Sequence, residues 1–375
     1  SVILSGLHNH ANGQYGHQHH FHKFNSYDNV VSLPVYMTAA GYRTARAGKY
    51  HVAPEEVYQF EKVIPGPMGN PWQLAENCRD FISEKSDKPF FLYICTSNPH
   101  RGGGKATELP GKPDRFGNPR RDNKAAREHE VVYDLDDVFI FISDHGIAMP
   151  GAKTTVYEGG LHAPLLVRNP FNEKRGVVCN AMISWVDLTP TILDYAGALD
   201  TKTGKVKQEI LAKVPNVKLN EQRNGDLTRG GFHGRSFLST LTETDPQGWD
   251  EIFASHTVQG SERAYPLKVV RERKYKLIWN IAYPLPFPFA SDLWAAPTWQ
   301  AQLAKGKDAP YGKWTVGSYV QRSQFQLFDL ENDPYEGKNL AELSEYSEVL
   351  ERMKKKLKEY QKRTDDPWIL KWSYE

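Results

Sequence analysis

Residues 138–146 read Val-Phe-Ile-Phe-Ile-Ser-Asp-His-Gly, and this stretch decides how the chain is expected to fold. Five consecutive apolar residues are typical of a β-strand that is covered on both faces, as in a parallel sheet. Asp144 and His145 follow the strand directly. Because ligands gather beyond the carboxyl ends of strands in open α/β sheets, the loop with these two side chains is a candidate functional site.

Strand-like and helix-like segments alternate around this stretch in the first two thirds of the chain. Further strands are predicted over residues 42–47, 89–95 and 164–167. Helices are predicted over residues 32–41, 72–85 and 189–195. The alternation predicts an α/β fold with a mainly parallel central sheet covered by helices.

The pattern changes after a polar, lysine-rich stretch at residues 200–231, which we interpret as an insertion. Strand-like runs follow at residues 252–255, 275–279 and 325–330. An amphipathic helix over residues 346–360 closes the chain. We therefore expect a main domain over residues 1–244 and a smaller α+β subdomain with an antiparallel sheet over residues 245–375.

The composition is that of a globular protein with nearly balanced charge. The 375 residues include 47 Lys and Arg against 45 Asp and Glu, which leaves a formal net charge of +2. This balance excludes the basic field of a dedicated nucleic-acid-binding protein. No apolar run approaches the roughly 20 residues of a membrane-spanning helix. The widely spaced Cys78, Cys95 and Cys179 form neither a CxxC metal motif nor a disulfide scaffold.

Basic and imidazole side chains gather at the ends of the predicted strands. They are Lys49 and His51 after one strand, His100 and Arg101 after the next, and Lys153 beyond the Asp-His pair. The loop with His100 and Arg101 is explained equally well as an ordinary flexible loop, and Lys49 and His51 alone are a weak signal. Together, positive groups at successive strand ends favour an anionic, oxygen-rich substrate such as a sulfate or phosphate ester.

Two groups of residues raise the question of a metal ion. A carboxylate and an imidazole in one loop, as at Asp144 and His145, can bind a cation, although a solvated turn is the alternative. Six of the thirteen histidines also fall within the first 22 residues. They are His8, His10, His17, His19, His20 and His22. Because they lack helical metal-site spacing, we favour a loop that packs against or lines a cleft over a metal site.

The order and spacing of these motifs resemble those of the type I sulfatases of the alkaline-phosphatase-like superfamily. The matching segments are residues 4–13, 48–51, 99–101, 143–146, 157–160, 187–191 and 327–334. Within the family, the chain is most similar to the heparan N-sulfatase branch. The segments that favour this branch are residues 21–26, 99–101, 285–288, 296–298 and 366–368. The resemblance implies an alkaline-phosphatase-like sandwich, with the catalytic domain in residues 1–244.

The resemblance also implies an activity, the removal of sulfate from an N-sulfo or O-sulfo glucosamine of a heparin- or heparan-type glycan. Family members use a divalent cation, usually calcium with magnesium as an alternative, and a formylglycine made from the first residue of a Cys/Ser-x-Pro-x-Arg motif. Asp144 and His145 match the metal ligands. The residues that match catalytic positions are Lys49, His51, His100 and Lys153. His100 is the expected general acid, because imidazole titrates near working pH.

Four further residues are expected to contact the substrate. They are Arg101, His162, His256 and Lys268. His162 and Lys268 stand where the resemblance leads us to expect arginine. The other expectations are a sulfated saccharide partner, no nucleic acid, and a homodimer as an open alternative. The location implied is secreted or periplasmic in a bacterium and lysosomal in a eukaryote.

The chain departs from the family pattern at two places. The nucleophile motif is expected immediately before Ser1, and none of the three cysteines lies in such a motif. The approach to residues 138–142 is also shorter than in the family. Two explanations stay open, a longer protein with further segments or a truncated, inactive relative that binds sulfated glycans. A phosphoester or phosphonate hydrolase on the same fold is the rival enzyme.

Overall fold

The computed structural model describes residues 1–18, 22–97, 137–146, 149, 151–215, 231–258 and 264–374. Its strands are β1 (Arg43–Gly48), β2 (Lys62–Ile64), β3 (Phe90–Cys95), β4 (Phe139–Ile142), β5 (Leu165–Arg168), β6 (Glu251–Val258), β7 (Ala264–Glu272), β8 (Tyr275–Asn280), β9 (Pro310–Tyr311), β10 (Trp314–Thr315) and β11 (Phe325–Asp329). Its α-helices are α1 (Val2–Ser5), α2 (Asn9–Asn12), α3 (Leu33–Ala39), α4 (Pro71–Ser83), α6 (Glu158–Leu161), α7 (Leu188–Tyr195), α8 (Gln208–Leu211), α9 (Ser291–Trp294), α10 (Pro297–Leu303), α11 (Val316–Val320), α12 (Ser347–Arg363) and α13 (Lys371–Tyr374).

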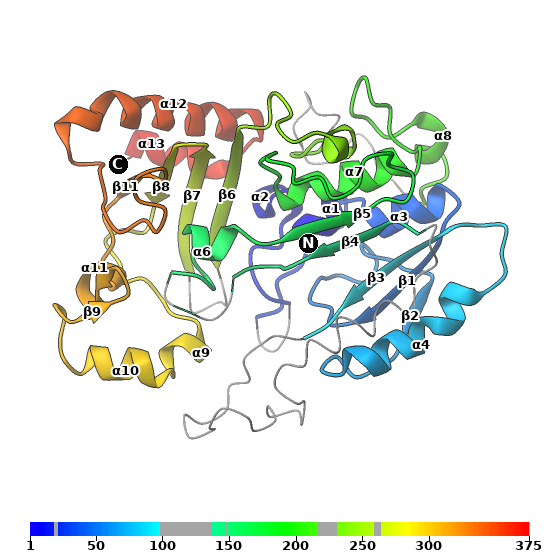
Figure 1. The fold of residues 1–375 in the computed structure, drawn as a ribbon, viewed down its shortest axis with the longest axis horizontal. Coiled ribbons are helices and arrows are strands. Elements are labelled where there is room, and N and C mark those ends of the chain that lie inside the picture. Colours follow the sequence, from blue (N-terminus) through cyan, green and yellow to red (C-terminus); the bar gives the residue numbers. More distant parts are fainter. Residues whose placement is uncertain are drawn as a thin grey trace.

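A parallel sheet of order β2-β1-β3 lies at one side of the molecule, with α3 and α4 on either side of it (Figure 1). Successive side chains of β3 point to opposite faces. Leu92 and Ile94 pack in the cluster that includes α4, whereas Phe91 and Tyr93 pack in the cluster that includes α3. The predicted α/β fold, with a parallel sheet covered by helices, is confirmed.

Helix α4 illustrates why the local predictions succeed in this region. Its N-cap residue is Asn70, whose Oδ1 accepts a hydrogen bond of 3.1 Å from the backbone N–H of Gln73. Leu74, Cys78 and Phe81 recur at helical spacing, and all three are buried against the parallel sheet. Capping and periodicity are local signals, and they agree here with the tertiary packing.

The apolar run at residues 138–142 pairs differently from the prediction. It forms β4, which pairs antiparallel with β5, so that Phe141 lies opposite Leu166. These two segments are therefore exceptions within the mainly parallel sheet that the sequence predicts. Phe141 and Leu166 are also 48% and 62% exposed, so the described residues cover this strand pair on one face only. An apolar run does not determine strand direction, because it is compatible with both kinds of pairing.

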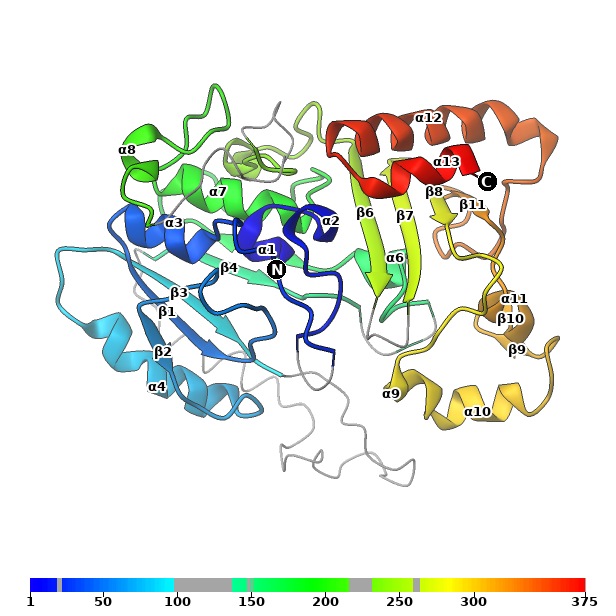
Figure 2. The ribbon, with the colours of Figure 1, turned by 180° about the vertical axis from the view of Figure 1, so that it is seen from behind.

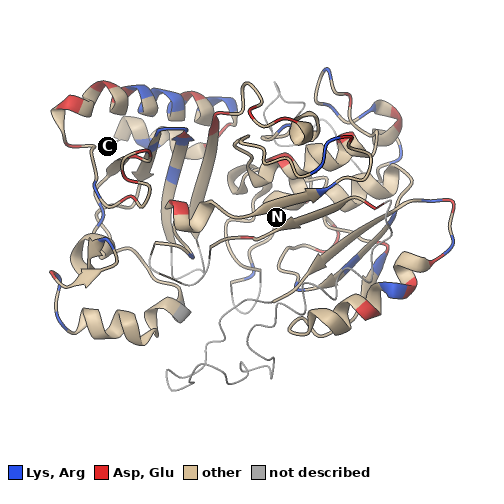
Figure 3. Cartoon of the chain, in the orientation of Figure 1, with Lys and Arg blue, Asp and Glu red and all other residues tan. Residues whose placement is uncertain are grey.

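The carboxy-terminal third contains the antiparallel sheet β11-β8-β7-β6. Helix α12 covers one face of this sheet (Figures 1 and 2). Met353 and Leu357 of α12 pack on that face, and an apolar cluster that includes Trp299 packs on the other. Figure 3 shows basic and acidic residues interspersed along α12. The sequence reading missed β7, which contains Pro266 and Lys268 among its apolar residues. The domain boundary near residue 244 stays a prediction.

Residues 156 and 157 join the two halves of the fold. Val156 and Tyr157 belong to the apolar cluster of the carboxy-terminal sheet, although they precede that sheet by about a hundred residues. The Tyr157 hydroxyl and the Gln326 side chain of β11 are within hydrogen-bond distance at 3.1 Å. Within the described residues, no helix is long and apolar enough to cross a membrane.

Candidate active site

A cleft of about 1780 Å³ brings together loops from both halves of the fold. Segments that follow β1 and β4 line it, together with α6, β5 and β6. Seven of the site residues predicted from the sequence line this cleft. They are Lys49, His51, Asp144, His145, Lys153, His162 and His256. Residues about two hundred positions apart in the sequence therefore line one cleft.

The end of β1 places Lys49 near the end of β3. Gly48 has a φ of 84°, and a Cβ at this position would collide with the carbonyl of Cys95. The backbone N–H of Lys49 donates to that carbonyl at 2.6 Å. Burial raises the pKa of the Cys95 thiol, Lys49 opposes this increase, and Asp144 adds to it. The charges of Lys49 and Asp144 thus act on the same thiol from two different strands.

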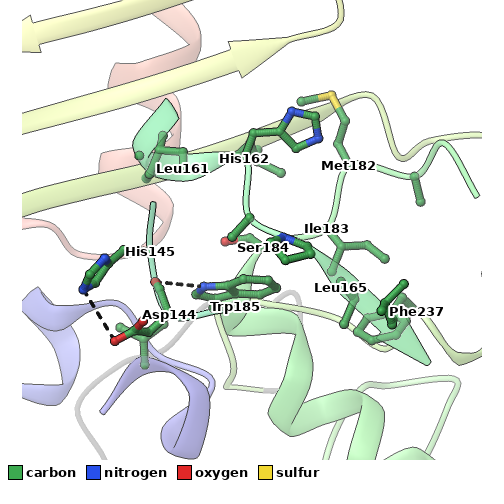
Figure 4. A pocket seen from close by; sticks show the side chains of 18 of the residues that line it. Asp144, His145, Leu161, His162, Leu165, Met182, Ile183, Ser184, Trp185 and Phe237 are labelled. Atoms are coloured by element: carbon green, nitrogen blue, oxygen red, sulfur yellow. Dashed lines mark hydrogen bonds and ion pairs between the residues drawn. The ribbon is translucent and has the colours of Figure 1, made fainter. Parts of the chain in front are cut away.

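The loop after β4 exposes a carboxylate and an imidazole to the cleft (Figure 4). Asp144 Oδ2 and His145 Nε2 are 3.6 Å apart, and the side chains are 64% and 41% exposed. The Trp185 indole N–H donates to the Asp144 carbonyl at 3.4 Å. His145 Nδ1 lies 2.7 Å from the Gly146 carbonyl, which can only accept, so Nδ1 carries the proton. In the neutral ring, the lone pair is then on Nε2 and faces Asp144.

A glycine-rich turn packs against this loop. The backbone N–H of Gly146 donates to the Gly160 carbonyl at 3.2 Å. A Cβ at Gly146 would collide with the carbonyl of Gly159, so the close approach requires glycine. Lys153 lies in the preceding turn, where Thr154 has a φ of 62°. The backbone contact between Gly146 and Gly160 thereby joins the loop with the Asp-His pair to the segment that follows the Lys153 turn.

Comparison with known proteins establishes the family. A family model described as Sulfatase matches residues 1–198. Human N-sulphoglucosamine sulphohydrolase is 30% identical over 425 aligned positions, which cover 98% of this chain and 80% of the human protein. The chain belongs to the sulfatase family. The predicted family and its hydrolase activity are confirmed.

Solved structures share the fold of this sulfatase. One is described as a complex with its substrate D-glucosamine-2-N,6-O-disulfate; its TM-score is 0.60 at 16% identity, over 98% of this chain and 87% of that one. The phosphonate monoester hydrolase of Agrobacterium radiobacter has a TM-score of 0.56 at 13% identity, over 97% of this chain and 85% of that one. At these identities the similarity shows the fold alone, and it confirms the predicted alkaline-phosphatase-like architecture.

Among the described residues, Lys268 is the predicted site residue that does not line the cleft of the sulfatase. His100 and Arg101 lie outside the described residues, so their roles stay predictions. Lys268 lies elsewhere, with its Nζ 2.6 Å from Asp366 Oδ2 and both side chains buried. An ammonium group that is buried and paired in this way favours a structural role. Its predicted contact with substrate has no support from this placement.

The amino-terminal histidines divide between the cleft and the protein interior. His8, His17 and His22 line the cleft. His10 is buried, and its ring stacks on that of His233 with 5.1 Å between centroids. His19 and His20 lie outside the described residues. Within the part of the chain that the structure describes, no three His, Cys, Asp or Glu side chains are grouped as a metal site would require.

The sequence reading missed further basic residues of the cleft. They are Arg168, Lys174, Arg175, Arg271 and Arg273. Lys174 and Arg175 donate to the backbone carbonyls of Thr242 and Pro170, each at 3.1 Å. Arg168 directly follows the strand predicted over residues 164–167, so the strand-end rule could have found it. The other four do not directly follow a predicted strand, so the rule could not select them. A closer reading of residues 264–272 as a strand would have brought Arg271 into consideration.

We expect acid to destabilise the sulfatase between about pH 6.5 and pH 4. Burial lowers the pKa of His10 to about 4, although Asp366 opposes the decrease, and burial also lowers the pKa of His256 to about 4. An unperturbed histidine has a pKa of 6.5, so between pH 6.5 and pH 4 these two histidines bind protons in the unfolded chain but not in the folded protein. The free energy of unfolding therefore decreases as the pH falls, by on the order of 3 kcal/mol for each histidine. Urea unfolding at several pH values measures this slope.

The control is the double variant His10→Gln, His256→Gln. Because glutamine does not titrate, its free energy of unfolding should change less between neutral pH and pH 4. A slope as steep as that of the natural protein would contradict the assignment.

Proposed function

We propose that this sulfatase removes sulfate from a sulfated saccharide, at an N-sulfo or O-sulfo glucosamine of a heparin- or heparan-type glycan. The charge of the cleft is the observation that carries the proposal. Among the described residues that line it, seven are Lys or Arg and two are carboxylates, whereas the whole chain has a net charge of only +2. The basic residues are Lys49, Lys153, Arg168, Lys174, Arg175, Arg271 and Arg273. Such a cleft attracts and retains a polyanion.

The choice of glucosamine rests on similarity to other proteins. The human relative is named for N-sulphoglucosamine, and a structural neighbour is described as bound to glucosamine that bears N- and O-sulfates. Both proteins align over nearly the whole of this chain. The N-sulfo and O-sulfo positions differ in the atom that leaves, so a substrate panel separates them.

The proposed roles of the residues that line the cleft are based on where they lie, and those of His100 and Arg101 are based on the matching sequence positions alone. Lys49 and Lys153 line the cleft from different loops and would neutralise charge that develops on the sulfuryl oxygens. His51 adjoins Lys49 and would donate a hydrogen bond to the same group. His100 would protonate the leaving atom of the sugar. The residues proposed to hold the saccharide are Arg101, His162 and His256.

Asp144 and His145 fit one side of a divalent cation site. A carboxylate oxygen and the Nε2 lone pair face each other at 3.6 Å, and both are open to the cleft. We propose calcium, with magnesium as the alternative, and when bound it would withdraw charge from a sulfuryl oxygen. Calcium usually takes about six to eight oxygen ligands, so further donors must complete the shell. Chelation should abolish sulfate release, and added calcium should restore it.

The proposed nucleophile is a formylglycine. None of the cysteines lies in a Cys/Ser-x-Pro-x-Arg motif, but Ser97 begins a stretch that matches this pattern by its letters, through Arg101. Ser97 lines the cleft, and its hydroxyl donates to the Met68 carbonyl at 3.0 Å. Peptide mass spectrometry of the purified natural protein should find an aldehyde in a Cys/Ser-x-Pro-x-Arg motif, which is expected immediately before Ser1, with Ser97 as the second position to examine. Absence of an aldehyde in every peptide would contradict the proposal.

A substrate panel tests the function as a whole. The purified protein with calcium should release sulfate from glucosamine N-sulfate, glucosamine 6-O-sulfate, or both. Hydrolysis of a phosphate monoester or phosphonate monoester without sulfate release would overturn the proposal in favour of the rival hydrolase. Saturable binding of heparin without any hydrolysis would instead indicate an inactive, glycan-binding relative.

A further inference from the structure

Glu158 stands at the junction between the cleft and the carboxy-terminal sheet. Its carboxylate is 3.1 Å from Lys276 Nζ of β8 and 3.1 Å from Arg271 Nη2 of β7. Lys276 Nζ also lies 2.8 Å from Glu336 Oε1, and the other oxygen of Glu336 accepts the backbone N–H of Glu158. Lys276 and Glu336 are 0% and 1% exposed. Four charged groups are thus joined in one largely buried network.

A buried network of this kind needs a reason beyond stability. Removing charges from water costs several kcal/mol for each ion, and buried pairs often stabilise no better than apolar residues of the same size. What such a network does provide is fixed geometry, because every member is held by several directional contacts. Burial alone would raise the pKa of Glu158, but Lys276 and Arg271 outweigh it and hold the pKa below its usual value. The carboxylate therefore stays ionised and retains both cations.

Glu158 is also the first residue of α6, which belongs to the wall of the cleft. Two residues later, the Gly160 carbonyl accepts a hydrogen bond from the backbone N–H of Gly146, the residue that follows His145. The turn with Lys153 immediately precedes this segment. On the cleft side, His162 Nδ1 lies 4.0 Å from Glu158 Oε2. Figures 1 and 2 show α6 beside β7, between the carboxy-terminal sheet and the β4–β5 pair.

We propose that Glu158 is a positioning residue of this sulfatase. Through it, the carboxy-terminal sheet fixes the turn with Lys153 and the loop with Asp144 in one relative position. Glu158 acts through these loops and not on the substrate. A test by sulfatase activity rests on the proposed function, whereas a test by amide hydrogen exchange does not.

The test compares Glu158→Gln with the matched variant Glu272→Gln. Glu272 lies in β7 next to Arg271, but it pairs on the α12 side, 2.6 Å from Arg352 Nη1 and 2.6 Å from Lys356 Nζ. Both substitutions remove one charge from an ion-pair network of the same sheet. Glu158→Gln should lower kcat for glucosamine N-sulfate about 10-fold with little change in KM, because small misplacements affect the transition state most. Glu272→Gln should leave both constants unchanged.

Amide hydrogen exchange provides the readout that does not depend on turnover. In Glu158→Gln, exchange should accelerate at Gly146 and over residues 158–162 but not in β1 or β3. Glu272→Gln should leave both regions unchanged. Unaltered exchange in the Glu158 variant, or an increase spread equally over the whole chain, would overturn the proposal. The second result would indicate loss of global stability only.

Two further outcomes are distinguishable. If neither the natural protein nor the variant releases sulfate, the proposed function fails, and the exchange pattern alone decides whether Glu158 positions the loops. If Glu158→Gln does not fold, Arg271→Gln removes one cation and leaves the Lys276 contact in place. Faster exchange at Gly146 in that variant would support the proposal, and unchanged exchange would contradict it.

Discussion

Replacing Asp144 by asparagine should lower the rate of sulfate release by about 10²–10³-fold, the loss typical when a preorganised electrostatic group is removed from an active site. The amide has nearly the shape of the carboxylate, so the loop should keep its structure. It lacks the negative charge that would hold a cation beside His145. The measurement is kcat for glucosamine N-sulfate at saturating calcium. Calorimetric titration with calcium should show weakened binding in the same variant.

Asp80→Asn is the control for this substitution. Asp80 is an exposed residue of α4 that does not line the cleft, and its replacement by asparagine is the same chemical change. It should leave kcat and calcium affinity unaltered. If Asp144→Asn retains full activity and full calcium affinity, the proposed metal position is wrong.

Replacing Lys276 by methionine should lower the free energy of unfolding by about 3–5 kcal/mol, the usual cost of breaking a buried ion pair from one side. Methionine is unbranched and only one heavy atom shorter than lysine, so little space is left empty. Glu158 and Glu336 would lose the ammonium group that lies 3.1 Å and 2.8 Å from their carboxylates. The Lys276 side chain is fully buried, so water could not replace this contact easily. Urea unfolding followed by circular dichroism measures the difference.

Two comparisons make the Lys276 result interpretable. Lys355→Met alters an exposed lysine that is 3.9 Å from Glu359, and it should change the free energy of unfolding by less than about 0.5 kcal/mol. Adding Glu336→Gln to Lys276→Met removes the carboxylate left unpaired, so the double variant should be less destabilised than the sum of the single variants. Strict additivity would show that the two charges do not interact.

Several elements could be predicted because their signals are local. The stripe of Leu74, Cys78 and Phe81 predicts the face by which α4 packs, and the structure buries that face. The apolar run in β3 predicts a strand covered on both sides, which its two clusters confirm. In the same way, the positions of Lys49 and Asp144 directly after predicted strands indicate that both belong to the site, and both line the cleft.

Other features could not be read from the sequence because they depend on distant partners. Lys268 resembles an exposed substrate contact, but Asp366 from the end of the chain pairs with it inside the protein. Arg271 reaches the cleft only because β7 packs against α6, which is 113 positions away in the chain. Similarly, the path of the chain between β4 and β5 decides that the two strands pair antiparallel. The apolar pattern of β4 is compatible with parallel or antiparallel pairing, so it could not predict the strand direction.

The sequence by itself determined the family, the α/β class, and which side chains stand at the strand ends of this sulfatase, since residue type and short-range periodicity carry that information. Only the tertiary structure decided that these strand ends share one basic cleft with Arg271 and Arg273. It also decided that Lys276 and Glu336 are buried beneath the cleft. The physical reason is that burial and ion pairing arise from contacts between residues more than a hundred positions apart, and local patterns do not encode such contacts.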